Sequence, residues 1–93
     1  DELSPDAVCC LNDYCAGQLI KELIQRKINV DDIRFSGFDH SALSDFIPHA
    51  LLTVDPPMKE LGKTAAEMLI KQVENPHFGF QRKKLQAKVI RTK

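Results

Sequence analysis

The sequence lacks an excess of charge of either sign. Thirteen basic and 13 acidic residues cancel over its 93 positions, so the chain as a whole has no electrostatic basis for binding DNA, RNA or an anionic lipid surface. It also lacks a long hydrophobic run, since no apolar stretch approaches the roughly 20 residues that cross a bilayer. Its first six residues are acidic and polar, which is unlike a signal peptide. These absences favour an ordinary globular domain without a membrane partner.

Cysteine is scarce and poorly placed for crosslinking. The cysteines are Cys9, Cys10 and Cys15, and an odd number with two adjacent residues makes a poor disulfide framework. A zinc site needs about four ligands at suitable spacing, whereas the histidines are scattered over predicted loops, at His40, His49 and His77. We therefore predict no metal and no cofactor, and small buried thiols in a reducing cytoplasm.

Catalytic signals are equally sparse. Asp39, His40 and Ser41 contain the letters of a catalytic triad, but three consecutive residues cannot form the line from nucleophile to base to acid. Gly37 is a single glycine and not a phosphate-binding loop. The basic residues of positions 82–93 are typical of a solvated edge strand guarded by lysine, with nucleic-acid contact as the alternative. A small α/β enzyme stays only as a third interpretation.

What the sequence does contain is an alternation of strand and helix patterns. Residues 7–11 (AVCCL) form a short apolar run that is typical of a strand buried on both faces. Asn12 and Asp13 interrupt this run, and both are good helix N-caps. Over residues 14–26 the apolar positions fall on one stripe, as in a half-buried helix. Strand, polar turn and helix make the first half of a β-α-β unit.

The alternation continues through the middle of the chain. Residues 33–38 predict a second strand, and a short helical stretch follows through Phe46. Residues 51–54 predict a brief strand or an extended link. Because each strand is separated from the next by a helical or polar segment, the strands are expected to pair in parallel.

The last third of the sequence predicts one more helix and one more strand. Asp55 is expected to cap a strong helix that opens at two prolines and carries its apolar stripe between Met58 and Val73. Residues 85–90 alternate as a final strand, expected at a sheet edge. The order predicts an α/β fold with a mostly parallel sheet flanked by helices. A start directly on a buried-type strand suggests a fragment whose earlier strands are missing.

Polar residues follow two of the predicted strands. In open α/β sheets, ligands bind beyond the carboxyl ends of the strands, and Asn12 and Asp39 occupy two such ends. An amide and a carboxylate at adjacent strand ends suit sugar hydroxyls, because they donate and accept hydrogen bonds in a fixed geometry. The alternatives from the residues alone are a simple helix cap for Asn12 and a turn residue for Asp39.

Three stretches resemble, in order and spacing, the C-terminal region of LacI/GalR-type transcriptional repressors, whose fold the periplasmic sugar-binding proteins share. They are PDAVCCLNDYCAGQLIKEL, IRFSGFDHSALSDFIPHALLTVDPP and MKELGKTAAEMLI. The resemblance implies a periplasmic-binding-protein-like type I domain of two lobes with the ligand clamped between them. Residues 1–93 would be its C-terminal segment, a fragment of the C-terminal lobe. The N-terminal lobe and the DNA-binding domain would be absent from this chain.

The resemblance also implies roles for individual residues. Family members contact sugar hydroxyls through the asparagine of the ND pair and the aspartate of GFD, which are Asn12 and Asp39 here. Phe38 flanks that site and is expected either to contact the ligand or to belong to the core. The family's dimer contacts lie on the helix after ND and the short helix after GFD, where the matching positions are Gly17, Leu43 and Ile47.

The sequence departs from the family pattern at several positions. Many members carry a glutamine in TTVRQP that reaches the ligand, and Pro56 stands there in this chain, so that contact is lost. Lys27 replaces the usual glycine that ends the first helix and has to tolerate or avoid the left-handed conformation. The common VPEDI is shortened over residues 30–33. No helix-turn-helix is present in these residues, so a regulator of the arabinose-repressor type fits equally well.

The leading interpretation is the sugar-binding and dimerisation segment of a cytoplasmic transcriptional repressor that is not an enzyme. Sugar would favour a closed arrangement of the lobes and thereby shift DNA binding. The expected partners are a small sugar effector, a second copy of the chain, and DNA through a domain absent from this chain. The alternative is the C-terminal part of a periplasmic sugar-binding transport protein, although the unpaired cysteines favour the cytoplasm.

Overall fold

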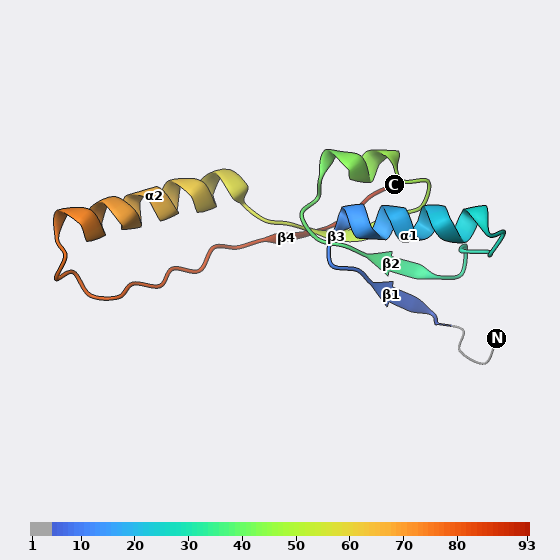
Figure 1. Cartoon of the computed structure of the whole chain (residues 1–93), viewed down its shortest axis with the longest axis horizontal. Coiled ribbons are helices and arrows are strands. Elements are labelled where there is room, and N and C mark those ends of the chain that lie inside the picture. Colours follow the sequence, from blue (N-terminus) through green and yellow to red (C-terminus); the bar gives the residue numbers. More distant parts are fainter. Residues whose placement is uncertain (1–4) are drawn as a thin grey trace. The chain divides into compact units, whose positions relative to one another are not determined.

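The computed structural model describes residues 5–93 and divides the chain into two compact units (Figure 1). The elements of the described residues are, in chain order, β1 (Ala7–Cys9), α1 (Asp13–Gln25), β2 (Arg34–Ser36), the 3-10 helix η1 (Ala42–Phe46), β3 (Leu51–Asp55), α2 (Met58–Glu74) and β4 (Lys88–Arg91). The first unit, called the sheet unit below, runs through Asp55 and resumes at Lys88–Lys93. The second, called the helix unit, is Pro56–Ala87. This order confirms the predicted α/β alternation.

Within residues 5–93, a four-stranded sheet of order β1-β2-β3-β4 forms the frame of the sheet unit. β1 pairs in parallel with β2, β2 in parallel with β3, and β4 antiparallel with β3. The sheet is therefore mostly parallel and the final strand lies at an edge, as predicted. β4 begins later than the alternation at 85–90 suggests. The reason is that its partner β3 ends at Asp55, opposite Lys88, and Pro56 has no N–H to extend the ladder.

Helix α1 covers one face of this sheet and forms the core with it (Figure 1). Ala16 and Ile20, four residues apart, are both 0% exposed and therefore lie on one side of the helix. They form a buried cluster with Phe35 and Leu51 of the sheet and with Ile47, which follows η1. The apolar stripe predicted for this helix is thereby confirmed at its centre, whereas Cys15 and Ile24 at its ends are exposed. Burial of a side chain such as Ile20 stabilises the fold by about 1.5–3 kcal/mol.

The expectation that the first strand is buried on both faces is wrong for the described residues. Ala7 and Cys9 are exposed, and Val8 between them is partly buried. Successive side chains of a strand point to opposite faces, and α1 covers only one of these faces. The uncovered face continues across the sheet to Leu52, which is 50% exposed and lies in register with Ser36 and, through it, with Cys9.

The two ends of α1 are built differently. At the start, Asn12 is the N-cap, and its Oδ1 accepts a hydrogen bond from Cys15 N at 2.8 Å, an arrangement that contributes about 1 kcal/mol. After the end, Lys27 adopts the left-handed conformation with φ 61°, and its N–H donates to Ile24 O at 2.9 Å. The lysine thus tolerates the conformation for which the family uses glycine, at a cost of roughly 1–2 kcal/mol.

The helix unit is dominated by α2, none of whose residues is buried. Its apolar stripe, from Met58 to Val73, is therefore uncovered within the described residues; Leu61 is 42% and Val73 is 71% exposed. The prediction that Asp55 caps this helix is wrong, because Pro57 occupies the N-cap and makes no side-chain cap bond. Two prolines separate Asp55 from the helix, so it ends β3 instead. No helix within residues 5–93 is long and apolar enough to cross a membrane.

Candidate functional site

The carboxyl ends of the parallel strands meet at one edge of the sheet unit. Backbone hydrogen bonds continue the pairing beyond the strands themselves. After β1, Cys10 N donates to Ser36 O at 2.9 Å. After β2, Asp39 N donates to Val54 O at the same distance. These bonds bring the segment that carries Asn12 and the segment that carries Asp39 to the same edge, where open α/β sheets bind their ligands.

Asn12 has two functional groups, and the fold uses one of them. Its side-chain oxygen caps α1 through Cys15 N, as the helix-cap alternative predicted. Its amide nitrogen, which provides two donors, has no acceptor among residues 5–93. The side chain is partly buried. A cap role and a ligand role are therefore compatible, because the oxygen serves the helix and the nitrogen is left for a hydroxyl group.

Asp39 and the residue after it form a strained turn. Asp39 has φ 96° and His40 has φ 46°, so two consecutive non-glycine residues lie in the left-handed region. Each such residue costs about 1–3 kcal/mol and persists only where the surroundings impose it. The surroundings do so here: His40 N donates to Thr53 Oγ1 at 3.2 Å and Ser41 N donates to an Asp13 carboxylate oxygen at 3.0 Å. The turn-residue alternative for Asp39 is thus correct for its backbone, while its exposed side chain stays outside these bonds.

Asp13 is the site residue that sequence reasoning missed. It is the first residue of α1 and is 0% exposed. Its Oδ1 accepts a hydrogen bond from Thr53 Oγ1 at 2.7 Å, and its Oδ2 accepts the one from Ser41 N. Its own N–H donates to Phe38 O at 3.1 Å. We weighed Asp13 only as an alternative helix cap, although one carboxylate here joins the segments after β1, after β2 and within β3.

Gly37 was the available signal for this arrangement. A Cβ at this position would lie 2.3 Å from Asp13 Oδ1 and 3.0 Å from Asp13 Cα. Real side chains do not approach so closely, so residue 37 has to be glycine for Asp13 to occupy its place. From the sequence, Gly37 is interpreted only as a single glycine that does not make a phosphate-binding loop. A glycine at the end of a strand also marks close approach of another backbone, and that second meaning is the correct one.

A second carboxylate stands beside the turn. Asp55, at the end of β3, has its Oδ2 3.5 Å from His40 Nδ1, and both side chains are partly exposed. The contact is an ion pair only when the histidine is protonated. Because β3 is the third of the parallel strands, Asp55 lies at the same edge of the sheet unit as the segment bearing Asp39. A polar side chain therefore stands at the carboxyl end of each of the three parallel strands.

Phe38 stands immediately before the strained turn and is 43% exposed. It is absent from the buried cluster of the described residues. The core alternative for this residue is therefore not supported, and its partly open ring is left at the edge that carries Asp39. An apolar face next to hydrogen-bonding groups is the usual composition of a small-molecule site.

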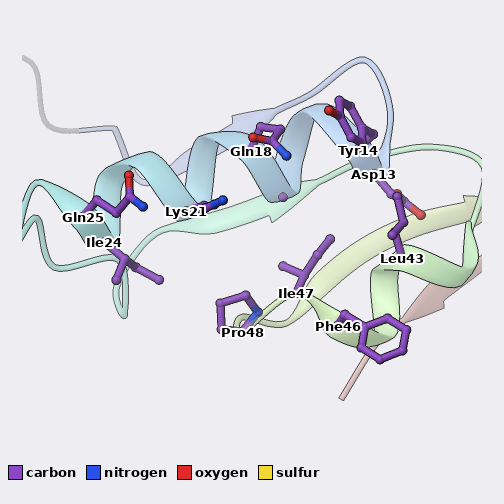
Figure 2. A pocket seen from close by; sticks show the side chains of 11 residues that line it. Asp13, Tyr14, Gln18, Lys21, Ile24, Gln25, Leu43, Phe46, Ile47 and Pro48 are labelled. Carbon is purple, nitrogen blue, oxygen red and sulfur yellow. The ribbon is translucent and has the colours of Figure 1, made fainter.

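The three residues predicted for dimer contacts lie at a hollow between α1 and η1 (Figure 2). Ile47 points towards α1 and is only 6% exposed. Gly17 makes room for it, since a Cβ there would lie 3.1 Å from Ile47 Cγ1. Leu43 is 50% exposed and Phe46, also at the rim, is 82% exposed. The apolar surface presented by this hollow is thus made by η1 more than by Ile47.

The cysteines lie around β1 and the start of α1. All are free thiols, but the prediction that they are buried is wrong, because Cys9 and Cys15 are exposed and Cys10 is only partly buried. Burial raises the pKa of the Cys10 thiol, and the neighbouring Cys15 and Cys9 raise it further. A thiol held in its neutral form is a poor nucleophile and a poor metal ligand. Within residues 5–93, no group of three or more histidine, cysteine or acidic side chains is placed to hold a metal ion.

Comparison with known proteins identifies the fold. The family model described as "Periplasmic binding protein-like domain" matches residues 1–92. The chain belongs to this family. A solved LacI family transcriptional regulator from Enterococcus faecium with bound ribose superposes on 98% of the chain and 35% of its own length, with a TM-score of 0.79 and 26% identity. A putative LacI regulator from Bacillus cereus subsp. cytotoxis shares the fold over 99% of the chain and 33% of its own, with a TM-score of 0.85 and 24% identity.

Curated proteins similar to this chain include bacterial repressors. The HTH-type transcriptional repressor PurR of Photobacterium profundum is 38% identical over 72 residues, which are 76% of the chain and 22% of that repressor. The chain thus spans less than a quarter of the length of the curated relatives it matches. The resemblance to a fragment of the effector-binding domain of LacI-type regulators is confirmed. These relatives are transcriptional repressors.

Proposed function

We propose that this chain is the effector-binding and dimerisation segment of a bacterial transcriptional regulator, with a sugar as its effector. The observation that supports this proposal is that Asn12 and Asp39 lie at the same carboxyl edge of the sheet unit. The amide nitrogen of Asn12 and the carboxylate of Asp39 make no hydrogen bond within the described residues. Strained backbone clusters at functional sites, so the strained turn at Asp39 is expected to have a function. A solved neighbour with bound ribose supports the sugar assignment.

The chemistry of the edge fits a sugar better than a purely apolar ligand. A carboxylate accepts hydrogen bonds from two hydroxyls and an amide nitrogen donates to two more. Asp39 and Asn12 supply these groups, and the partly open ring of Phe38 supplies an apolar surface for the C–H face of a sugar ring. Nothing in this arrangement requires a cofactor or a metal, and no nucleophile with an adjacent base is placed at the edge. The proposed segment binds and does not catalyse.

The second part of the proposal concerns the partner. Leu43 and Phe46 offer exposed apolar surface on η1, and Gly17 lets Ile47 support that surface from beneath. In a symmetric dimer the same patch of both copies meets, so Leu43 is the residue through which a second copy of the chain would be contacted. Gly17 and Ile47 would act by shaping the patch.

Signalling would follow from differential affinity. A sugar that binds the closed arrangement of two lobes more tightly than the open one shifts the population, and the DNA-binding domain outside this chain senses the shift. The regulator would act in the cytoplasm. The alternative is a periplasmic sugar-binding transport protein, and the repressor names of the curated relatives favour regulation over transport.

Calorimetric titration of the intact protein with a panel of pentoses, hexoses and disaccharides tests the proposal. One sugar should bind wild type, and Asp39→Ala should cost several kcal/mol of binding, because it removes a charged hydrogen-bond partner. Asp32→Ala, which removes an exposed carboxylate before β2, is the matched control and should bind as wild type does. If no sugar binds, or if Asp39→Ala binds as tightly as wild type, the effector site is wrongly assigned.

A further inference from the structure

The buried contact between Asp13 and Thr53 adjoins the turn that carries Asp39, because both residues accept hydrogen bonds from its amides. Asp13 is 0% and Thr53 is 1% exposed, and Thr53 Oγ1 donates to Asp13 Oδ1 at 2.7 Å. The two residues are 40 positions apart, so the contact is tertiary. We propose that Asp13 and Thr53 are positioning residues that set the affinity for the sugar by holding the Asp39–Ser41 turn. This inference rests on the proposed function.

The direction of each hydrogen bond in this network is fixed by chemistry. A carboxylate only accepts, so the single hydroxyl proton of Thr53 is committed to Asp13. The lone pairs of Thr53 Oγ1 are then available to His40 N, which lies 3.2 Å away. The other carboxylate oxygen of Asp13 accepts from Ser41 N. Two consecutive amides of the turn are therefore held by one buried pair.

The turn needs these anchors because its backbone is unfavourable. Asp39 and His40 both have positive φ, and neither is glycine, so a free segment of this sequence would relax to ordinary conformations. The amides of Asp39, His40 and Ser41 each donate one hydrogen bond. Without the Asp13–Thr53 pair, only the bond from Asp39 N to Val54 O would remain. Relaxation at His40 would rotate the preceding peptide and move the Asp39 carboxylate away from the edge.

Gly37 gives an independent route to the same effect. A Cβ there would lie 2.3 Å from Asp13 Oδ1, so the carboxylate would have to leave its place while every hydrogen-bonding side chain stays present. Gly37→Ala should therefore reproduce the loss of sugar affinity caused by losing the Thr53 hydroxyl. If Gly37→Ala caused only a local packing defect, the hydrogen bond from His40 N to Thr53 Oγ1 would stay intact.

The test compares three variants of the intact protein by titration with the sugar panel. Thr53→Val keeps the shape and loses the hydroxyl, and should lower affinity at least tenfold. Thr53→Ser restores the hydroxyl and should bind within about threefold of wild type. Thr92→Val is the matched control, because it removes another buried hydroxyl, bonded to Leu51 at the amino end of β3; it should leave affinity unchanged. Equal affinities for Thr53→Val and Thr53→Ser would overturn the proposal.

Two further readouts separate positioning from loss of stability. In an Asp39→Asn background, Thr53→Val should cost less than about threefold, because the residue acts through Asp39; an undiminished tenfold loss would overturn the proposal. In the absence of sugar, Thr53→Val should speed amide hydrogen exchange at His40 and Ser41 at least tenfold relative to Thr53→Ser. If wild type binds no sugar, the proposed function fails, and exchange alone decides. Acceleration at these two amides supports the positioning role, and unchanged exchange overturns it.

Discussion

At its amino end β3 is held through the hydroxyl of Thr92, and two residues further towards its carboxyl end it is held through the hydroxyl of Thr53. Thr92 Oγ1 accepts from Leu51 N at 2.9 Å and donates to Leu51 O at 3.4 Å, so its bonds begin and end on one residue. Thr53 Oγ1 instead connects the buried carboxylate of Asp13 to the amide of His40. Thr92 therefore contacts one residue of β3 alone, whereas Thr53 connects β3 to the strained turn at Asp39 and His40.

The same difference separates the other polar groups of the two ends. At the amino end, the ring nitrogens of His49 lie 2.8 Å from Ala50 O and 3.0 Å from Val30 O, and its ring packs edge-on against Phe35. Both ring nitrogens of His49 therefore contact the backbone and are not available to a ligand. At the carboxyl end, the Asn12 amide nitrogen has no acceptor among the described residues. One end of the sheet thus serves stability, and the other keeps hydrogen-bonding capacity for a ligand.

Asp13→Ala should give the largest effect, because it removes the acceptor of two buried donors. We expect the free energy of unfolding to fall by about 3 kcal/mol and sugar affinity to fall at least a hundredfold. Thermal unfolding and calorimetric titration of the intact protein measure the two quantities. Asp32→Ala, at an exposed carboxylate, should change stability by less than about 0.5 kcal/mol. If Asp13→Ala were as stable as wild type, the buried carboxylate would have no structural role.

His49→Phe should give a smaller effect, confined to stability. Phenylalanine keeps the edge-on contact with Phe35 and loses both ring-nitrogen contacts, so we expect a loss of about 1 kcal/mol. Sugar affinity should stay within twofold of wild type, because the change lies at the amino end. A tenfold loss of affinity in titration would show that the two ends of the sheet are not independent.

The smallest effects on stability should come from relieving backbone strain at each end. Lys27→Gly relaxes a residue with φ 61° after α1, and should stabilise the protein by roughly 0.5–1 kcal/mol without changing affinity. Asp39→Gly relaxes φ 96° in the same way, yet should abolish sugar binding because the carboxylate is lost. Thermal unfolding with and without sugar distinguishes the two. If sugar stabilised Lys27→Gly and Asp39→Gly to the same extent, the Asp39 turn would have no role in sugar binding.

Local patterns predicted most of the fold, and tertiary contacts explain the failures. The alternation of apolar runs and helical stripes placed each strand and helix in order, and the ND pair located the cap of α1 at Asn12. The pair of Asp13 and Thr53 escaped prediction because it joins residues 40 positions apart, and no local pattern encodes such a contact. Asp55 was misassigned because an acidic residue before a proline is typical of a helix cap. Asp55 Oδ2 instead lies 3.5 Å from His40 Nδ1. His40 belongs to the loop after β2, so this contact is tertiary and no local pattern predicts it.

The burial of β1 was misjudged for a related reason. An apolar run such as AVCCL reports which side chains suit burial, and not which elements cover them. In the described chain α1 covers one face, so Ala7 and Cys9 stay exposed. The same holds for α2, whose apolar stripe was predicted correctly but is uncovered within residues 5–93.

The most direct test of the effector site is a crystal structure of the intact protein with the sugar that titration selects. We expect the Asp39 carboxylate and the Asn12 amide nitrogen each to lie within hydrogen-bond distance, about 2.7–3.2 Å, of sugar oxygens. We also expect Asp39 and His40 to keep positive φ and Asp13 still to accept from Thr53. A sugar bound elsewhere, with neither Asn12 nor Asp39 in contact, would contradict the assignment of this edge as the effector site.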